Sequence, residues 1–320
     1  MIVLLKAPPF ATIQDRGRPR MRGQGVPLSG AMDIESLVFA NLLAGNKPGA
    51  AVIEWALGEG TIRLTDTRTF SVFGATVDMN HSTLPPAMTL LGEAGDEITL
   101  HVPERRFAYI AFGGGVNTPE VLGSRSTYLP GAFGGHEGRR LKTGDKLPLG
   151  PPVNEWNTGW TDRIAEFLPR SEGPVRVVPG PQVDLFDPEQ IDRLLSGKLA
   201  VGRGSDRMGY RLEGQEFTHH APAALPSEPV CVGAVQVPQG GSPIVLMPDG
   251  PTVGGYPKIA AVITADLGRF AQLAPAERPR FEMVTFEEAV AGLRDRDRRL
   301  HEAVRVTLGE IHTANTDLHR

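Results

Sequence analysis

Short segments in which apolar and polar residues alternate recur along the chain, for example at residues 61–64, 70–73, 97–100 and 107–112. A period of two is typical of strands that are buried on one face only. Glycine and proline, 38 and 28 of the 320 residues, lie between these segments as turn formers. The pattern predicts a mainly β protein built from barrels or sandwiches.

Apolar residues recur every three or four positions in only a few stretches, and these predict helices. The first is residues 34–43, where Ser29 or Asp33 could cap the start and Gly45 follows the end. A short helix is predicted at residues 188–195, and the longest is predicted at residues 286–311.

A change in pattern at residues 151–174, rich in proline and asparagine, predicts a linker. A strand signal resumes at residues 175–178. We therefore expect one β domain at residues 1–155, a second at 175–284, and a helical extension at 285–320.

The composition favours an ordinary globular protein of a reducing compartment. The formal net charge is −4, which argues against a broad surface for nucleic acid or anionic membrane. The single cysteine, Cys231, lies between two valines and is expected to be buried. No apolar run approaches the length of a membrane span, so we expect a cytoplasmic protein without an anchor.

Several mechanisms lack their sequence motifs. The chain has no phosphate-binding loop, no dinucleotide fingerprint, no zinc or calcium spacing, and no serine nucleophile elbow. The adjacent pair His219 and His220 would point in different directions on a strand, which disfavours a metal site. No Met-Lys-Met segment is present, so the chain does not carry biotin itself.

Polar residues beside glycines form the first two candidate ligand sites. One combines the segment 14–18 with the segment 25–33, and the other combines residues 113–115 and 131–135 with the segment 122–128. Glycine lets a backbone approach a ligand closely, and an arginine can pair with a carboxylate or phosphate. Ordinary turns and tight barrel bends would explain the same glycines.

A third site is predicted at residues 205–212, where Asp206, Arg207, Tyr210 and Arg211 lie close in sequence. On a strand, Arg207 and Arg211 would share one face, and Asp206 and Tyr210 the other. In a loop, all four could converge on a planar anion. A solvated surface turn is the alternative.

A fourth site is predicted at residues 249–260. Lys258 follows Gly254, Gly255 and Tyr256, and Asp249 lies just upstream. A lysine in this setting can hold an oxyanion or a carboxylate, and an aspartate can orient an amide N–H. An exposed lysine after a glycine turn is the alternative.

Together, in this order, the motifs resemble those of the KipA family of biotin-dependent carboxyltransferases, also described as the urea carboxylase/allophanate hydrolase subunit 2 family. The resemblance covers residues 3–281 and is carried by the segments 14–18, 29–33, 41–46, 123–128, 205–212 and 255–260. It implies two cyclophilin-like β-barrels.

The resemblance also implies an activity. Stand-alone members of this length resemble the C subunit of an ATP-dependent 5-oxoprolinase, which converts 5-oxo-L-proline to L-glutamate together with a KipI-like B subunit and a LamB/YcsF-like A subunit. The expected catalytic residues are Arg207, Tyr210, Arg211, Asp249, Tyr256 and Lys258. The expected substrate-binding residues are Gln14, Asp15, Arg18, Ser29, Met32, Asp33, Ser124, Arg125, Ser126, Asp206, Gly254 and Gly255. ATP is expected to bind mainly on a partner protein of the complex.

Two alternatives remain open at this point. The chain could transfer a carboxyl group from biotin on a partner chain to a small amide such as urea. It could instead be a non-enzymatic antagonist of a KipI-like histidine-kinase inhibitor. One departure from the family pattern bears on the substrate, because Pro251 and Val253 stand where a glutamine and a threonine are usual. The tail helix is expected to pack on a barrel or a second copy, with docking of a partner as the alternative.

Overall fold

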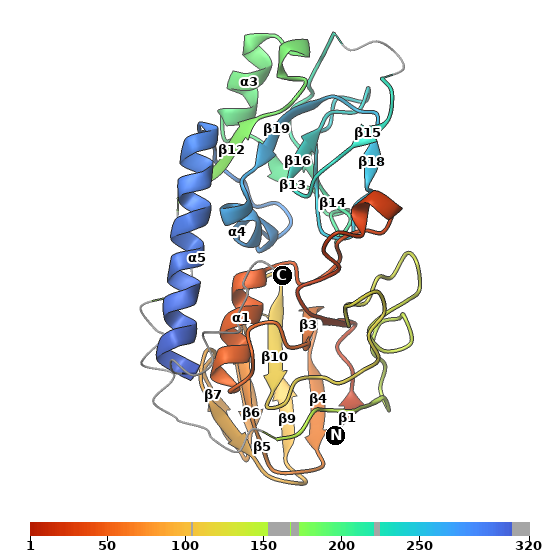
Figure 1. The fold of residues 1–320 in the computed structure, drawn as a ribbon, viewed down its shortest axis with the longest axis vertical. Helices are drawn as coiled ribbons and strands as arrows, with labels where there is room; N and C mark the ends of the chain where they lie inside the picture. The colour runs from red at the N-terminus through yellow and green to blue at the C-terminus, as the bar shows by residue number, and fades with distance from the viewer. Residues whose placement is uncertain (104, 153–166, 168–172, 221–224, 309–320) are drawn as a thin grey trace. The chain divides into compact units, whose positions relative to one another are not determined.

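The computed structural model describes the chain except residues 104, 153–166, 168–172, 221–224 and 309–320. It divides into two compact units (Figure 1). The first unit consists of residues 1–19, 29–169 and 297–320, and the second of residues 20–28 and 170–296. Most of the predicted linker at 151–174 lies outside the described residues. The predicted domain limits stay a prediction.

The first unit contains two antiparallel sheets within the described residues. One has the strand order β11-β1-β4-β9-β6-β7 and the other β2-β3-β10-β5-β8. The strands are β1 (Ile2–Lys6), β2 (Phe10–Gln14), β3 (Val52–Leu57), β4 (Gly60–Leu64), β5 (Arg68–Phe73), β6 (Val77–Met79), β7 (Ser82–Leu84), β8 (Leu90–Gly92), β9 (Glu97–Leu100), β10 (Ala108–Phe112) and β11 (Lys146–Leu147).

Both sheets contribute to one hydrophobic core in the first unit. Leu4 of β1 and Ile62 of β4 come from one sheet, and Trp55 of β3 and Ile110 of β10 from the other. Strand β4 alternates between buried and more exposed residues, whereas β5 and β10 are buried throughout. The reason is that helix α1 (Ile34–Leu43) packs against β5 and β10 (Figure 1), so both faces of these strands are covered.

Helix α1 has the predicted bounds, and its cap is the predicted Asp33. The Asp33 carboxylate accepts a hydrogen bond from the backbone N–H of Ser36 at 3.2 Å. The helix ends at Leu43 and Ala44 is its C-cap. Gly45 follows with a φ of 78°, the left-handed conformation that glycine adopts without steric cost.

The second unit contains a seven-stranded sheet and a two-stranded sheet within the described residues. Their strand orders are β13-β14-β17-β16-β19-β12-β20 and β15-β18. The strands are β12 (Val175–Pro179), β13 (Ala200–Val201), β14 (Gly209–Glu213), β15 (Glu228–Pro229), β16 (Ala234–Gln236), β17 (Ile244–Leu246), β18 (Val253–Gly254), β19 (Lys258–Val262) and β20 (Phe281–Met283).

Short helices complete the second unit. They are the 3₁₀ turns η1 (Arg22–Gln24), η3 (Val183–Leu185) and η4 (Thr264–Asp266), and the helices α3 (Pro188–Leu195) and α4 (Leu267–Ala271). The bounds of α3 are those predicted. Tyr210, Phe270 and Phe281 pack one after another, with ring centroids 5.4 and 6.1 Å apart, and anchor α4 to the sheet.

The long helix α5 (Phe286–Leu308) confirms the predicted tail helix, whose last residues lie outside the described part of the chain. It passes through the division between the units, because residues up to Arg296 belong to the second unit and those from Asp297 to the first. The prediction of a mainly β protein with few helices is confirmed. The prediction for Cys231 was wrong: its neighbour Val230 is buried but the cysteine is exposed, because a turn follows β15.

Candidate functional site

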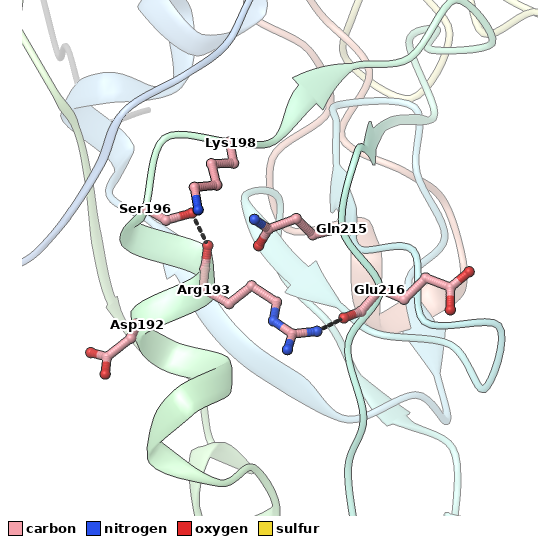
Figure 2. Close-up of a pocket in the computed structure, with 6 residues that line it drawn as sticks. All are labelled: Asp192, Arg193, Ser196, Lys198, Gln215 and Glu216. Carbon is pink, nitrogen blue, oxygen red and sulfur yellow. Dashed lines mark hydrogen bonds between the residues drawn. The ribbon is translucent and has the colours of Figure 1, made fainter.

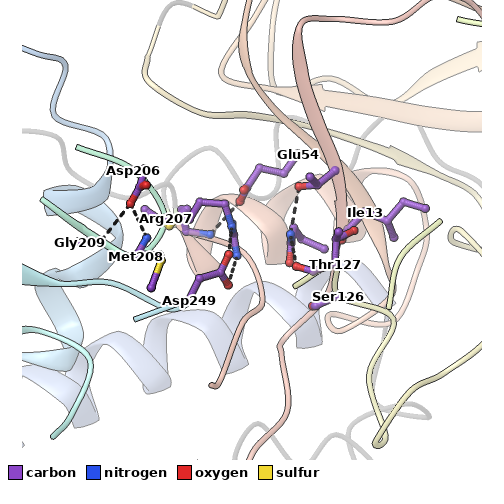
Figure 3. A network of polar contacts seen from close by, with 12 residues as sticks. Ile13, Glu54, Ser126, Thr127, Asp206, Arg207, Met208, Gly209 and Asp249 are labelled. Carbon is purple, nitrogen blue, oxygen red and sulfur yellow. Dashed lines mark hydrogen bonds and ion pairs between the residues drawn. The ribbon is translucent and has the colours of Figure 1, made fainter. Parts of the chain in front are cut away.

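Arg207 and Asp249 form a buried, bidentate ion pair in the second unit (Figure 3). Nε of Arg207 lies 2.8 Å from Oδ2 of Asp249, and Nη2 lies 3.1 Å from Oδ1. The two side chains are only 4% and 2% exposed. Because the contact is bidentate and buried, this pair holds the loop after β17 against the loop before β14. The structure brings the two predicted residues together in a supporting position.

The rest of the third predicted site does not converge. Strand β14 begins only at Gly209, so Arg207 lies in the turn before it and shares no strand face with Arg211. Arg211 is exposed, whereas the Tyr210 side chain is buried and its hydroxyl donates to the carbonyl of Ala271 at 2.5 Å. Asp206 accepts hydrogen bonds from the N–H groups of Met208 and Gly209 (Figure 3). Of the two arrangements considered, the one with Arg207 and Arg211 on a single strand face is therefore wrong.

The fourth predicted site is more promising, because it holds a buried lysine. Lys258 is the first residue of β19, and its side chain is 5% exposed. Its ammonium lies 2.6 Å from Oε1 of Glu228 and donates to the carbonyl of Tyr256 at 3.2 Å. An ammonium has three N–H donors. Within the part of the chain that the structure describes, these two contacts leave one donor for a ligand.

Gln182 fixes the positions of Lys258 and Glu228 through two hydrogen bonds. Its Nε2 donates to Oε1 of Glu228 at 2.7 Å, and its Oε1 accepts from the backbone N–H of Lys258 at 3.2 Å. The hydrogen bond from Lys258, followed by the one from Gln182, lowers the pKa of the Glu228 carboxyl below its usual value. The Glu228 side chain is 43% exposed, so this charged pair has a solvent-facing side and a buried side.

The glycines before Lys258 shape the same site. Gly254 lies directly opposite Glu228 in the β15–β18 pair. A Cβ on Gly255 would lie 2.8 Å from the carbonyl of Leu225, so only glycine fits there. Tyr256 is 48% exposed and contacts Lys258 through its backbone carbonyl. The predicted residues Gly254, Gly255, Tyr256 and Lys258 thus form one cluster, which also contains Glu228 and Gln182.

The predicted site residues of the first unit form a separate buried network around Asp15. Its carboxylate accepts from the hydroxyls of Ser124 and Ser126 at 2.6 and 2.5 Å, and from the backbone N–H groups of Gly17 and Arg125 at 2.8 and 2.6 Å. These bonds fasten the turn after β2 to the loop at residues 121–127. The network satisfies the carboxylate completely and has the character of a structural support.

Gln14 and Arg18 support the same loop. Nε2 of Gln14 donates to the carbonyl of Thr127 at 3.2 Å, and Nη2 of Arg18 donates to the carbonyl of Ser126 at 2.6 Å. Both side chains are fully buried. Gly134 lies so close that a Cβ there would meet the Ser126 carbonyl at 2.1 Å, which supports the tight-bend explanation of this glycine segment.

Of the remaining predicted residues, Arg125 has its side chain bound by neighbouring residues of the chain. It donates to the carbonyl of Thr118 at 2.7 Å and to Asn117 Oδ1 at 2.9 Å, and it pairs with Glu120 at 2.5 Å. The other predicted residues lie at the start of α1, where Asp33 is the cap, Met32 donates its backbone N–H to Glu54 at 2.8 Å, and Ser29 is buried with a φ of 54°.

A cavity of about 510 Å³ in the second unit contains none of the predicted residues (Figure 2). It is lined by Asp192, Arg193, Ser196, Lys198, Gln215 and Glu216. Arg193 donates to the carbonyl of Glu216, and the Ser196 hydroxyl donates to the carbonyl of Arg193 at 2.7 Å. The first bond joins the end of α3 to Glu216, the second lies within the end of the helix, and the open shape gives no enclosed ligand site.

The chemistry available at the Lys258 cluster is electrostatic. A buried ammonium beside a carboxylate can stabilise negative charge that develops on a carbonyl oxygen. Among the residues that the structure describes, no three His, Cys, Asp or Glu side chains are grouped so as to hold a metal ion. The described helices include none that is long and apolar enough to span a membrane.

Sequence reasoning missed Glu228 and Gln182. They lie 30 and 76 positions before Lys258 and come next to it only through the β15–β18 pair and the turn after β12. No local motif marks them. A charge in the short apolar segment before Cys231 was the only available signal for Glu228.

Residues 24–283 match the carboxyltransferase domain, subdomain A and B. Because this match spans most of the chain, the protein belongs to the carboxyltransferase domain family. Within that family, it is 35% identical over 301 residues to the 5-oxoprolinase C subunit of Escherichia coli strain K12, a match that covers 93% of this chain and 96% of that protein. It is also 35% identical over 298 residues to the 5-oxoprolinase C subunit of Haemophilus influenzae, covering 90% of this chain and 93% of that protein.

Among solved structures, the urea carboxylase of Kluyveromyces lactis superposes with a TM-score of 0.87 at 26% identity. The match covers 94% of this chain but only 29% of that much longer one. The family expected from the sequence motifs is thereby confirmed.

Proposed function

We propose that the protein is the C subunit of an ATP-dependent 5-oxoprolinase, active in the cytoplasm together with the LamB/YcsF-like and KipI-like subunits. The observation that carries this proposal is the 35% identity to two 5-oxoprolinase C subunits, over at least 90% of both partners in each comparison. A similarity of equal length on both sides favours the same role in the same kind of complex.

In the proposed reaction, 5-oxo-L-proline binds with its lactam carbonyl oxygen toward the Lys258 ammonium. That oxygen attacks the terminal phosphorus of ATP and ADP departs. Water then adds to the ring carbon, and the ring C–N bond opens to give a free amine and an acyl phosphate. A second water hydrolyses the acyl phosphate to glutamate and phosphate. The buried ammonium stabilises the negative charge of the phosphoryl group on that oxygen, and Glu228 and Gln182 fix the position of the ammonium. The chain has no phosphate-binding loop, so we place the main ATP site on a partner protein of the complex.

The Pro251 and Val253 departures affect the rim of this site. Val253 is 55% exposed in β18, and the Pro251 carbonyl accepts a hydrogen bond from Arg22 at 3.0 Å. Because the unusual residues act through an exposed side chain and a backbone carbonyl, they leave the Lys258 cluster intact. We expect them to alter substrate affinity and to spare the chemistry.

The test mixes this chain with its purified LamB/YcsF-like and KipI-like partners and follows ADP and glutamate release from 5-oxo-L-proline, omitting each chain in turn. Release of both products only in the complete mixture supports the proposal. An intact complex, verified by gel filtration, that releases neither product would contradict it and would favour the antagonist of a KipI-like inhibitor.

The second candidate function is carboxyl transfer from biotin on a partner chain to a small amide. The observation that favours it is the TM-score of 0.87 to urea carboxylase over 94% of this chain. The two candidates share the polarisation of an amide carbonyl by Lys258. Avidin capture of a biotinylated partner together with this chain, and bicarbonate-dependent ADP release with urea, would support the second function over the first.

A further inference from the structure

A break in strand register places Gln236 opposite Lys258. In the β16–β19 pair, Ala234 lies opposite Ala261 and Val235 opposite Ala260, but Gln236 lies opposite Lys258. Ile259 is therefore the extra residue of a β-bulge. Bulges of this kind are common beside active sites because they redirect side chains. Directly opposite residues of an antiparallel pair have their side chains on the same face, so the amide of Gln236 and the ammonium of Lys258 lie on one face.

The Gln236 amide is buried without using its hydrogen-bonding capacity. The residue is 4% exposed, and its Nε2 has no hydrogen-bond partner among the residues that the structure describes. A buried N–H group without a partner destabilises the folded protein, and native proteins contain few of them. This donor lies beside a candidate site and is available to a ligand.

Gly254 leaves room for this amide because it has no side chain. A Cβ on Gly254 would lie 2.6 Å from Nε2 of Gln236, closer than a van der Waals contact permits. Gly254 is also the residue opposite Glu228, which holds Lys258. The amide, the ammonium and the glycine thus belong to one cluster, although they come from β16, β19 and β18.

We propose that Gln236 is the residue that recognises the amide group of the substrate, through a reciprocal pair of hydrogen bonds. Its Nε2 donates to the substrate carbonyl oxygen, and its Oε1 accepts from the substrate N–H. This inference rests on the proposed function and deepens it.

The chemistry of the substrate fits this pairing. A five-membered lactam has its N–H and C=O on the same edge, because the ring fixes the amide as cis. A primary carboxamide presents one donor and one acceptor side by side. The two groups are therefore complementary, and the carbonyl oxygen receives a second donor from Lys258. Urea also presents an N–H group and its C=O on one edge. The same pair of hydrogen bonds would therefore recognise the substrates of both 5-oxoprolinase and urea carboxylase.

The experiment compares 5-oxo-L-proline with its N-methyl derivative in the complete three-protein complex, for the wild type and for Gln236→Leu. In the wild type, N-methylation removes one hydrogen bond and should raise KM several-fold. Gln236→Leu should raise the KM for 5-oxo-L-proline about 10- to 100-fold with a smaller change in kcat. In this variant, the two substrates should differ by less than about threefold, because the shared interaction is gone. Equal discrimination in both proteins would overturn the assignment.

Two further variants separate recognition from folding. Gly254→Ala keeps the glutamine but places a methyl group against its amide, and it should raise KM as Gln236→Leu does. Gln215→Leu is the matched control, because Gln215 also has a buried unsatisfied atom, Oε1, but lines the separate cavity of Figure 2. It should leave KM unchanged. Gln236→Leu should also melt no lower than the wild type, and a marked drop in Tm would point to a structural role and contradict the proposal.

If the proposed function is wrong, the wild-type complex turns over neither lactam. The role of Gln236 is then tested by measuring lactam binding to the isolated chain. Ligand-observed NMR with 2-pyrrolidone and N-methyl-2-pyrrolidone should show a preference for the N–H lactam that Gln236→Leu abolishes. Absence of that preference in the wild type would overturn the inference independently of turnover.

Discussion

At the scale of single residues, the most informative side chain is Lys258, because it is charged and yet buried. Its only described charged neighbour is Glu228, whose own side chain is nearly half exposed. Burial strengthens electrostatic interactions because water no longer screens them. The ammonium can therefore act on a bound carbonyl more strongly than a surface lysine would.

Replacement of Lys258 by methionine should reduce kcat of the reconstituted complex about 10²- to 10³-fold, the usual effect of removing one donor to an oxyanion. Glu228 would keep its hydrogen bond from Gln182 and its exposure to water, so the fold should survive. Steady-state kinetics and a melting curve measure the two effects. Wild-type kcat in a folded Lys258→Met protein would remove Lys258 from the mechanism.

Arg207 and Asp249 should behave as a structural unit. Arg207→Ala leaves a carboxylate buried without its partner, and we expect a loss of about 3–5 kcal/mol in the free energy of unfolding. The double variant Arg207→Met with Asp249→Leu removes both charges and should recover most of that loss. Urea unfolding of the three proteins tests this, and a double variant as unstable as the single one would show that the charges do more than satisfy each other.

At the scale of secondary-structure elements, Asp266 joins three segments of the second unit. Its carboxylate accepts from the backbone and guanidinium of Arg176 in β12, at 2.7 to 3.0 Å, and from Arg269 in α4 at 2.9 Å. Burial alone raises the pKa of this carboxyl, but the hydrogen bonds from Arg176 and the charge of Arg269 outweigh burial and lower the pKa below its usual value.

This lowered pKa predicts how stability depends on pH. The folded-state pKa lies below the unfolded value near 3.8, so the stabilisation is complete above about pH 4 and is lost as the pH falls through the folded-state pKa. Asp266→Asn should therefore lower the free energy of unfolding at pH 7 by about 2–4 kcal/mol and approach the wild type in acid. Urea unfolding from pH 7 to pH 2.5 measures this, and a constant difference across the range would contradict it.

The elements could be predicted from sequence where the signal is local. Helix α1 and helix α3 have the predicted bounds, because apolar spacing, caps and following glycines are all written in adjacent residues. The bulge at Ile259 could not be predicted, since register depends on the partner strand. For the same reason, the sequence indicated Lys258 but not Glu228 or Gln182, which reach it through tertiary pairing.

At the scale of the whole molecule, helix α5 has two different environments along its length. Phe286 and Val290 are 62% and 45% exposed, whereas Leu300, Ala303 and Val304 are at most 3% exposed. Arg299 pairs with Glu35 of α1 in the first unit. The later half of the helix is thus buried, and the expectation that its apolar stripe packs on a barrel or a second copy stays a prediction. The earlier half remains accessible.

The contrast can be tested within one helix. Leu300→Ala should cost about 2–5 kcal/mol in the free energy of unfolding, because it leaves a cavity among buried side chains. Val290→Ala, at an exposed position of the same helix, should change it by less than about 0.5 kcal/mol. Thermal and urea unfolding of both variants measure the difference. A loss for Leu300→Ala as small as that for Val290→Ala would mean that the buried half contributes nothing to stability.

The division of the chain into two units restricts where gene recombination can separate them. Residues 20–28 belong to the second unit, where Arg22 donates to the carbonyls of Val230 and Pro251, and residues from Asp297 onward belong to the first. The second unit therefore includes a segment from within the N-terminal part of the first, and the first includes the segment that follows the second. A recombination breakpoint between residues 169 and 170 would separate each unit from a segment that belongs to it. Gene fusions should therefore contain both units together. The urea carboxylase of Kluyveromyces lactis fits this expectation, because 94% of this chain has its counterpart within that one longer polypeptide.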